Sequence, residues 1–384
     1  MFFVVLAKTI KILQNQPYNY MAGFVLMDMK RVFLNPNYRI TKKQDSFECI
    51  NNQGNLQVVK GKEYQCLINL FDTKTEWELS DLLSKLMGIF SNKEGARFFL
   101  FKNIRAGLLI LEPDKHDFNE TEIQRYKRQL KFWNQYQNEK DDSYDIQNNL
   151  KRKQVSVIGL GGQGSVVAAY LGMVGVGSLK LIDGDSVDIS NLSRQIFYTH
   201  ENIGKNKAVV LSEYIKRQNP FISVESIPKF IEKPEDATAF LRDSDFIVLC
   251  GDNPMVKLRE WINIYAVKNK IPYIGVSGSW VGPMYVPGLS ACYECEKDYY
   301  RKKYPMYDEL IDWIINRTES SHRPAFAFRP SLSGLLIAQQ AVKYLSGVMN
   351  VEVTKGRWRM DLEMNTGFEE IPRNHKCKIC GKNK

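Results

Sequence analysis

The chain has no long apolar run. None of its 384 residues belongs to a stretch that approaches the roughly 20 apolar residues of a membrane-spanning helix. The apolar opening, residues 1–7, has no basic leader and runs directly into Lys8, so a buried strand explains it better than a signal peptide. We therefore expect a cytoplasmic protein that does not engage a membrane.

Histidine is scarce, and most of the few cysteines are paired. The histidines show neither metal-ligand nor catalytic-triad spacing, so surface or packing roles are expected for His116, His200, His322 and His375. The seven cysteines include two Cys-x-x-Cys pairs. In a protein that is not secreted, such pairs indicate metal ligands rather than a disulfide framework.

Acidic residues are outnumbered by basic ones. Lys and Arg number 53 against 43 Asp and Glu, which leaves a formal net charge of +10. This charge suits an anionic partner, such as a phosphate, a nucleotide or a nucleic acid, without choosing among them. A hydrophobic share of 44% excludes a disordered or fibrous chain. Because the length exceeds the ~100–200 residues of one domain, we expect at least two domains.

The first 112 residues predict a small module of strands and helices. Residues 1–6, 23–27 and 56–59 are β-like, and residues 97–101 and 107–111 resemble the two strands of a wing. Between them, Thr75 and Glu78 fit a capping box ahead of helically spaced leucines at Leu79, Leu82, Leu83 and Leu86. The combination predicts a winged-helix-like module, with a plain α+β cap as the alternative. Nucleic-acid binding is not expected, because the stretch is not notably basic.

The rest of the chain predicts an α/β domain. Residues 113–150 are expected to form a polar helix at 120–136 and a charged linker at 138–149. Compact apolar strands, separated by helical segments, follow at 155–158, 179–182, 246–249 and 273–276. This alternation predicts a mainly parallel sheet wrapped by helices over residues 151–384.

A glycine-rich loop follows the first of these strands. The segment Gly159-Leu-Gly161-Gly162-Gln-Gly164 enters a helix near Ser165, a pattern in which backbone amides and the helix start bind a phosphate. Asp183 closes the next strand, at the separation where an acidic residue meets a ribose hydroxyl. To this point, a nicotinamide or flavin dehydrogenase fits as well as an ATP enzyme.

Charged motifs downstream favour nucleotidyl transfer. They are Asp183-Gly-Asp185, Ser190-Asn-Leu-Ser-Arg194-Gln195, Gly204-Lys-Asn-Lys207 and Gly251-Asp252-Asn253. A dehydrogenase does not need an Arg, a Lys and an Asp around its phosphate loop. Attack on an α-phosphate does, because negative charge builds on its oxygens and on the departing pyrophosphate. In that scheme Arg194 and Lys207 meet the phosphates, and Asp252 holds Mg²⁺.

This ordered series resembles the adenylating domain of the ThiF/MoeB family, kin of the ubiquitin-activating enzymes, over about residues 119–384. The resemblance implies a Rossmann-like domain that binds ATP, or another nucleoside triphosphate, with Mg²⁺. It implies that Asp183 binds ribose, that Asn191, Arg194 and Lys207 serve the phosphates, and that Asp252 is the metal-linked catalytic carboxylate. The same motifs place Gly159, Gly161, Gly162, Gly164, Asp185, Gln195 and Asn253 in the nucleotide site.

The segment Gln124-Arg125-Tyr-Lys-Arg128-Gln129 resembles the family's Arg-Tyr-x-Arg-Gln segment, whose second arginine enters the partner subunit's site. The resemblance implies a homodimer in which Arg128 is catalytic in trans. A solvated helical face is the alternative.

The two cysteine pairs predict a metal site. Cys292-Tyr-Glu-Cys295 and Cys377-Lys-Ile-Cys380 can supply four thiolates to a tetrahedral Zn²⁺, and a closed four-sulfur site is structural. Family members that form a thioester carry a cysteine after the first pair, whereas residues 296–328 contain none. Cys250, on the apolar strand before Asp252, is expected to be a small buried residue. We therefore expect an amide or amine to attack the adenylate, or the activated acyl group to be transferred directly to another protein.

Three features point away from the sulfur-carrier branch of this family: the missing cysteine, the extra N-terminal module, and the segments 282–288, 291–297 and 323–328. Together they are similar to the MccB-type peptide adenylyltransferases of microcin C antibiotic biosynthesis. In that branch the N-terminal module clamps a short ribosomally made peptide as an added strand. The peptide carboxylate is activated with ATP, and a terminal Asn amide then forms a succinimide on the way to a phosphoramidate. Alternatives are activation of a ubiquitin-like sulfur carrier, a non-catalytic peptide-docking scaffold and a dinucleotide oxidoreductase.

Overall fold

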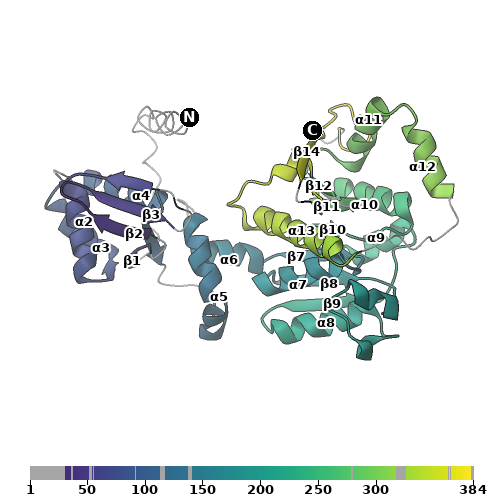
Figure 1. Cartoon of the computed structure of the whole chain (residues 1–384), viewed down its shortest axis with the longest axis horizontal. Coiled ribbons are helices and arrows are strands. Elements are labelled where there is room, and N and C mark those ends of the chain that lie inside the picture. The colour runs from purple at the N-terminus through teal and green to yellow at the C-terminus, as the bar shows by residue number, and fades with distance from the viewer. Residues whose placement is uncertain are drawn as a thin grey trace. The chain divides into compact units, whose positions relative to one another are not determined.

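The computed structural model describes residues 31–35, 38–51, 54, 56–90, 92–112, 117–136, 141–277, 280–316, 326–361, 363 and 365–381. The chain divides into two compact units, Met1–His116 and Asp117–Lys384 (Figure 1). The finer division expected at residues 112 and 150 stays a prediction, and the strands expected at 1–6 and 23–27 lie outside the described residues. Among the described residues, no helix combines the length and apolar character that crossing a bilayer requires.

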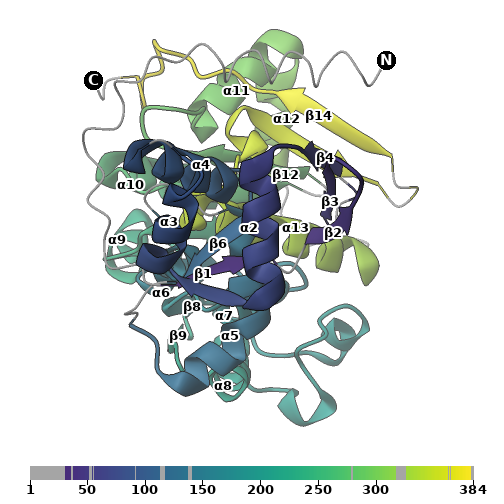
Figure 2. The same cartoon turned by 90° about the vertical axis from the view of Figure 1, so that its left-hand side faces the viewer.

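The first unit contains two small antiparallel sheets. One has the order β5-β1-β6 and the other β2-β3-β4. Their bounds are β1 Arg31–Leu34, β5 Glu76–Glu78 and β6 Leu109–Glu112, then β2 Tyr38–Lys42, β3 Phe47–Asn51 and β4 Leu56–Val59. The helices are α2 (Lys62–Thr73), α3 (Leu79–Met87) and α4 (Lys93–Arg105), and Figure 2 shows α2 in purple beside β2 to β4. Fully buried Val32, Leu67 and Leu82 lie in the core of this unit.

The predicted strand at 56–59 and the helix carrying Leu79 to Leu86 are confirmed. The first wing strand is wrong, because residues 97–101 lie within α4. Their aromatic content favoured a strand, but Ala96, Phe99 and Leu100 are buried at helical spacing, and the Asn92 side chain accepts a hydrogen bond from the amide of Gly95 at 2.7 Å. The capping box is also wrong, since residues 76–78 form β5 and α3 has no side-chain cap.

The second unit is built on an eight-stranded, mostly parallel sheet. Its order is β14-β13-β12-β11-β10-β7-β8-β9, with the first three antiparallel and the other five parallel. The parallel strands are β7 (Gln154–Ile158), β8 (Ser178–Ile182), β9 (Ser223–Ile227), β10 (Phe246–Leu249) and β11 (Tyr273–Ser277). The antiparallel strands are β12 (Trp280–Tyr285), β13 (Gly356–Met360) and β14 (Thr366–Glu370). The expected mixed α/β fold with a mainly parallel sheet is thus confirmed.

Helices cover both faces of this sheet. Phe246 and Val248 of β10 belong to one apolar layer, whereas Ile247 and Leu249 belong to the other, as expected for a strand buried on both sides. The first layer includes residues of α6 (Ser143–Lys151), α7 (Gly164–Val174), α8 (Lys207–Gln218) and α13 (Phe328–Ser346). The second includes α9 (Pro234–Phe240), α10 (Met255–Asn269) and α11 (Tyr293–Lys303); α5 (Glu120–Trp133) and α12 (Tyr307–Asn316) complete the described α-helices (Figure 1).

The charged linker expected at residues 138–149 is in part the helix α6. Asp142 caps it, because its Oδ1 accepts hydrogen bonds from the amides of Tyr144 at 2.7 Å and Asp145 at 3.0 Å. Ile146 and Leu150 are fully buried in the first apolar layer. The polar residues around these two apolar positions concealed the helix in the sequence.

Candidate functional site

The glycine loop is shaped by a close approach of two chain segments. Gly159 follows β7 with a φ of +79°, and a Cβ atom there would lie 2.4 Å from the amide nitrogen of Gly251 after β10. A Cβ atom at Gly164 would lie 1.8 Å from the Gly159 carbonyl oxygen. Only glycine permits this packing, and α7 begins at Gly164 itself. The loop after β10, which continues into Asp252 and Asn253, therefore lies against the glycine loop.

Asp183 joins the end of β8 to the same loop. Its Oδ2 accepts a hydrogen bond from the Leu160 amide at 2.6 Å, and its Oδ1 accepts one from the Asp185 amide at 2.8 Å. The side chain is buried. Burial raises the pKa of Asp183, although these hydrogen bonds and the nearby Lys207 oppose the shift.

Lys207 lies at the start of α8 beside this carboxylate pair. Its Nζ is 2.8 Å from Asp185 Oδ2; the lysine side chain is 7% exposed, while that of Asp185 is 55% exposed. Asn206, which sequence reasoning missed, donates from Nδ2 to the carbonyl oxygens of Asp183 at 3.0 Å and Asp185 at 3.1 Å. Its Oδ1 also caps α8. An asparagine directly before a helical segment was the clue available in the sequence.

The Asn-Leu-x-Arg-Gln segment forms the short helix η3 (Ile189–Ser193) and its exit. Asn191 Oδ1 accepts from the Asp188 amide at 3.1 Å, and Arg194 Nη1 donates to the Ser190 carbonyl oxygen at 2.8 Å. A Cβ atom added at Gly162 would lie 3.4 Å from the Arg194 carbonyl oxygen, so this segment packs against the glycine loop. Gln195 is 3% exposed, and its Oε1 has no hydrogen-bond partner among the described residues. Its Nε2 is 3.8 Å from a Cβ position at Gly161.

The start of α13 also touches the glycine loop, a contact that the sequence did not reveal. A Cβ atom at Gly162 would lie 2.9 Å from the Pro330 side chain. Gln163 Nε2 donates to Ser333 Oγ at 2.8 Å. Segments far apart in the chain therefore meet around this loop, and they carry the residues predicted to bind a nucleotide. The catalytic and binding roles of those residues stay predictions.

Cys250 is unsuited to nucleophilic attack. It lies between β10 and Asp252, and its Cβ is 3.1 Å from a Cβ position at Gly164. Burial raises the pKa of its thiol to about 12, so it is protonated at neutral pH. Of the histidines, His200 and His375 are exposed as expected, whereas His116 and His322 lie outside the described residues.

The four paired cysteines gather at one point. All four are buried, and their Sγ atoms lie within 4.8 Å of one another. Cys292 is 3.9 Å from Cys295 and 3.8 Å from Cys377, and Cys295 is 3.5 Å from Cys380. Tetrahedral coordination with ~2.3 Å metal–sulfur bonds needs sulfur separations of about 3.8 Å. The cysteines therefore fit a tetrahedral metal ion, which would fasten the C-terminal segment to α11.

Arg128 lies on the exposed side of α5. The opposite side is anchored, since Gln129 Nε2 donates to Gln147 Oε1 at 2.6 Å and Asn219 Nδ2 donates to the Tyr126 hydroxyl at 2.8 Å. These contacts anchor one side of the helix and leave Arg128 exposed, and its action in trans stays a prediction.

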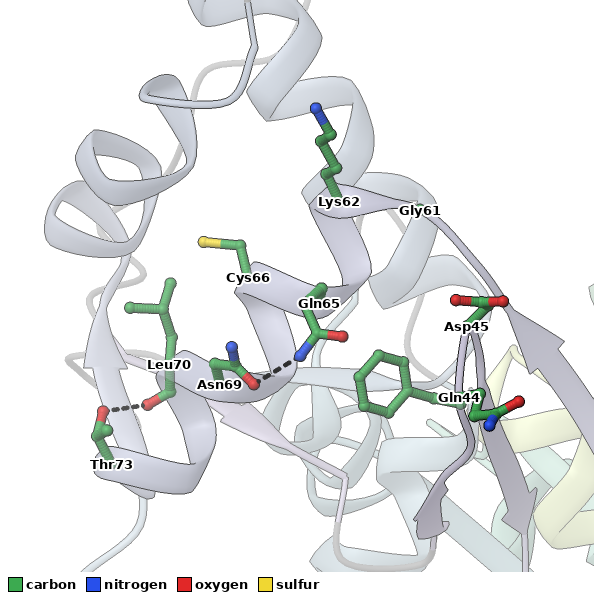
Figure 3. Close-up of a pocket in the computed structure, with 10 residues that line it drawn as sticks. Gln44, Asp45, Gly61, Lys62, Gln65, Cys66, Asn69, Leu70 and Thr73 are labelled. Carbon is green, nitrogen blue, oxygen red and sulfur yellow. Dashed lines mark hydrogen bonds between the residues drawn. The ribbon is translucent and has the colours of Figure 1, made fainter.

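The first unit carries a groove of about 620 Å³ between α2 and the β2–β3 turn (Figure 3). Figure 3 shows Lys62, Cys66 and Leu70 of α2 on one side and Gln44 and Asp45 on the other. The groove is lined by both polar and apolar groups, from Gln44, Asp45, Phe47, Gly61, Lys62, Gln65, Cys66, Asn69, Leu70 and Thr73.

Comparison with known proteins agrees with this geometry. Residues 126–381 match the ThiF family. The chain is 30% identical to the sulfur carrier protein ThiS adenylyltransferase of Escherichia coli (strain K12), over 68% of this chain and 97% of that protein. It is 28% identical to the molybdopterin-synthase adenylyltransferase of the same strain, over 69% of this chain and 99% of that protein.

Solved structures share the fold over most of the chain. The crystal structure of E. coli MccB with ATP covers 91% of this chain and 100% of its own, with a TM-score of 0.69 and 24% identity. The glycine loop, its charged surroundings and the family match point to one conclusion. The chain belongs to the ThiF family and is an adenylyltransferase of the ThiF/MoeB type, which implies that it binds ATP.

Proposed function

We propose that this enzyme uses ATP to adenylate the C-terminal carboxylate of a short ribosomally made peptide, in an antibiotic pathway of the microcin C kind. The main support for an adenylation site here is the contact between Gly159 and Gly251. This contact brings the loop with Asp252 against the glycine turn that is proposed to bind phosphate. Lys207 and Arg194 lie on two further segments around that turn.

In the proposed reaction an oxygen of the peptide carboxylate attacks the α-phosphorus of ATP. The new bond joins that oxygen to phosphorus, the bond to the bridging oxygen breaks, and pyrophosphate leaves. The carboxylate is already ionised at neutral pH, so this step needs no general base. Lys207 and Arg194 stabilise the charge that develops on the phosphates. Asp252 would hold Mg²⁺, which supplies further charge neutralisation when bound.

The first unit is the proposed peptide-binding module. Strands β2 and β4 are the edges of their sheet within the described residues, and Leu56 and Val58 of β4 are about half exposed. A peptide added as a strand would gain main-chain hydrogen bonds at such an edge. The groove beside α2 offers additional room for side chains. E. coli MccB, which shares the fold, has been crystallised with ATP, with MccA and with a succinimide.

The missing thiol removes the candidate for a thioester step. Residues 296–328 contain no cysteine, so we propose attack by a terminal Asn amide to give a succinimide, and then a phosphoramidate. The enzyme is proposed to be a homodimer with Arg128 acting in trans. Zn²⁺ is proposed for the cysteine cluster, whose sulfur separations suit it.

A second candidate is activation of a ubiquitin-like sulfur carrier. It is favoured by the relatives named above, one of which is a sulfur carrier protein adenylyltransferase at 30% identity. The docking scaffold and the oxidoreductase have no comparable support, since the matched relatives are named as adenylyltransferases.

Pyrophosphate exchange distinguishes the two candidates. We expect a short peptide ending in Asn to drive incorporation of labelled pyrophosphate into ATP, whereas a protein ending in Gly-Gly does not. Asp252→Ala should abolish the exchange and leave peptide binding intact, while Asp312→Ala, at an exposed position on α12, should retain both. Exchange driven only by the Gly-Gly protein would select the second candidate. Exchange that survives Asp252→Ala would overturn the assigned role of Asp252.

A further inference from the structure

A continuous series of contacts connects the glycine loop with the cysteine cluster. Gly251 packs on Gly159 and also against the first turn of α10. A Cβ atom added at Gly251 would lie 3.2 Å from Cδ2 of Leu258 in that turn. The next residue, Arg259, places Nη2 3.4 Å from Oε2 of Glu296 in α11. Glu296 directly follows Cys295, and its amide donates to the Cys292 carbonyl oxygen at 3.0 Å.

Arg259 occupies a confined position. Its guanidinium lies 4.4 Å from the centroid of the Tyr293 ring, and Nη2 is 3.6 Å from a Cβ position at Gly275 in β11. Its ion-pair partner Glu296 is 5% exposed and also lies 3.8 Å from Arg357. A buried carboxylate of this kind is costly to leave without its cation, so the pair holds α10 and α11 in one relative position.

Hydrogen bonds of an uncharged side chain also connect α10 with α11. Asn263 Oδ1, in α10, accepts hydrogen bonds from the Tyr293 amide at 3.0 Å and from the Tyr273 hydroxyl at 2.9 Å. Asn263 is 3% exposed. The start of α11, where the first two cysteines lie, is thus joined to the middle of α10 as well as to its first turn.

We propose that Arg259 is a positioning residue that couples the cysteine cluster to the nucleotide site. Through Glu296, it links the metal-held start of α11 to the first turn of α10, which follows Asp252 by three residues. The inference rests on the proposed function of Asp252. A coupling between two binding sites is reciprocal, so bound nucleotide must tighten the retention of the metal by the same factor that the metal strengthens nucleotide binding.

Zinc affinity is the first readout. The zinc-loaded protein is titrated with a colorimetric chelator, with and without saturating ATP and Mg²⁺. We expect ATP and Mg²⁺ to raise the zinc affinity of the unmodified protein about fivefold, the low end of common coupling strengths. Arg259→Gln and Glu296→Gln should lose this increase. Glu260→Gln is the matched control, because Glu260 adjoins Arg259 and pairs with Lys297 of α11 at 2.7 Å, on the more exposed side.

Calorimetric titration of ATP at a series of Mg²⁺ concentrations is the second readout. Arg259→Gln should raise the Mg²⁺ concentration needed for half-maximal binding, Arg259→Lys should restore it in part, and Glu260→Gln should leave it unchanged. If Arg259→Gln does not fold, Arg259→Lys and Glu296→Gln provide the same comparison.

The proposal is overturned if the unmodified protein takes up no zinc. It is also overturned if its zinc affinity is the same with and without ATP and Mg²⁺, or if Glu260→Gln loses the coupling as fully as Arg259→Gln. Failure of the proposed function gives a different result: Asp252→Ala would then keep the Mg²⁺ dependence of ATP binding.

Discussion

Lys207 Nζ lies 2.8 Å from Asp185 Oδ2 at the carboxyl edge of the central sheet. The two side chains differ in solvation, since that of the lysine is 7% exposed and that of the aspartate 55%. A buried cation held by a solvated anion can exchange that anion for a phosphate without moving its own stem. We therefore infer that Asp185 holds Lys207 in place until a nucleotide binds.

Removing this cation should slow adenylation. We expect Lys207→Ala to reduce kcat for pyrophosphate exchange by about 10²–10³, the usual effect of removing one preorganised group that stabilises transition-state charge. Lys205→Ala, two residues earlier and exposed, is the control and should keep the rate of the unmodified enzyme. An unchanged kcat in Lys207→Ala would contradict the proposed contact with the phosphates.

Arg128 is tested by mixing two inactive variants. Arg128→Ala and Asp252→Ala should each be inactive in exchange, but their mixed dimer has one complete site, in which the Asp252→Ala subunit supplies Arg128. Random pairing in a two-fold dimer should restore about a quarter of the activity. Lys131→Ala, on the exposed side of the same helix, should be active alone. No recovery on mixing would exclude action in trans.

The cysteine cluster should contribute to the stability of the second unit. Cys377→Ser is expected to abolish metal binding and to release the C-terminal segment. If this costs about 2–3 kcal/mol, the melting temperature falls by roughly 4–12 °C. Cys66→Ser, in the first unit, is the control for thiol removal. Metal analysis and a thermal melt test the prediction, and an unaltered melting temperature in a metal-free Cys377→Ser protein would contradict it.

Asp142 predicts an unusual dependence of stability on pH. Burial raises the pKa of this helix-capping carboxyl from 3.8 to about 6, although the amide hydrogen bonds oppose the shift. The pKa of Asp142 is thus higher in the folded state than in the unfolded state. Its contribution to the free energy of unfolding is therefore fully present below pH 3.8 and is lost as the pH rises through about 6.

Asp142→Asn keeps a capping side chain without the charge. Relative to this variant, the unmodified protein should lose at most about 3 kcal/mol of unfolding free energy between about pH 4 and pH 7. Urea denaturation of both proteins across this range measures the difference. A variant that becomes progressively less stable than the unmodified protein as the pH rises would show that the charge is favourable.

Many parts of the second unit could be predicted because short segments specify them. The apolar run of β7, the Gly159 turn and the two cysteine pairs each depend on neighbouring residues. Prediction of secondary structure from neighbouring residues failed where the intrinsic preference of a residue competed with tertiary packing. Phe98 and Phe99 favour a strand by composition, but Phe99 and Leu100 are buried on one side of α4. Ile146 and Leu150 direct the polar segment around them into α6.

Local pattern was sufficient for four of the five parallel strands, β7, β8, β10 and β11, and for the family resemblance. Long-range folding was needed to bring Gly251 against Gly159, to place Pro330 on Gly162, and to gather cysteines that are 85 residues apart. The reason is energetic: closing such long loops is unfavourable until the apolar layers on both faces of the sheet are buried together. No short stretch of residues carries that information.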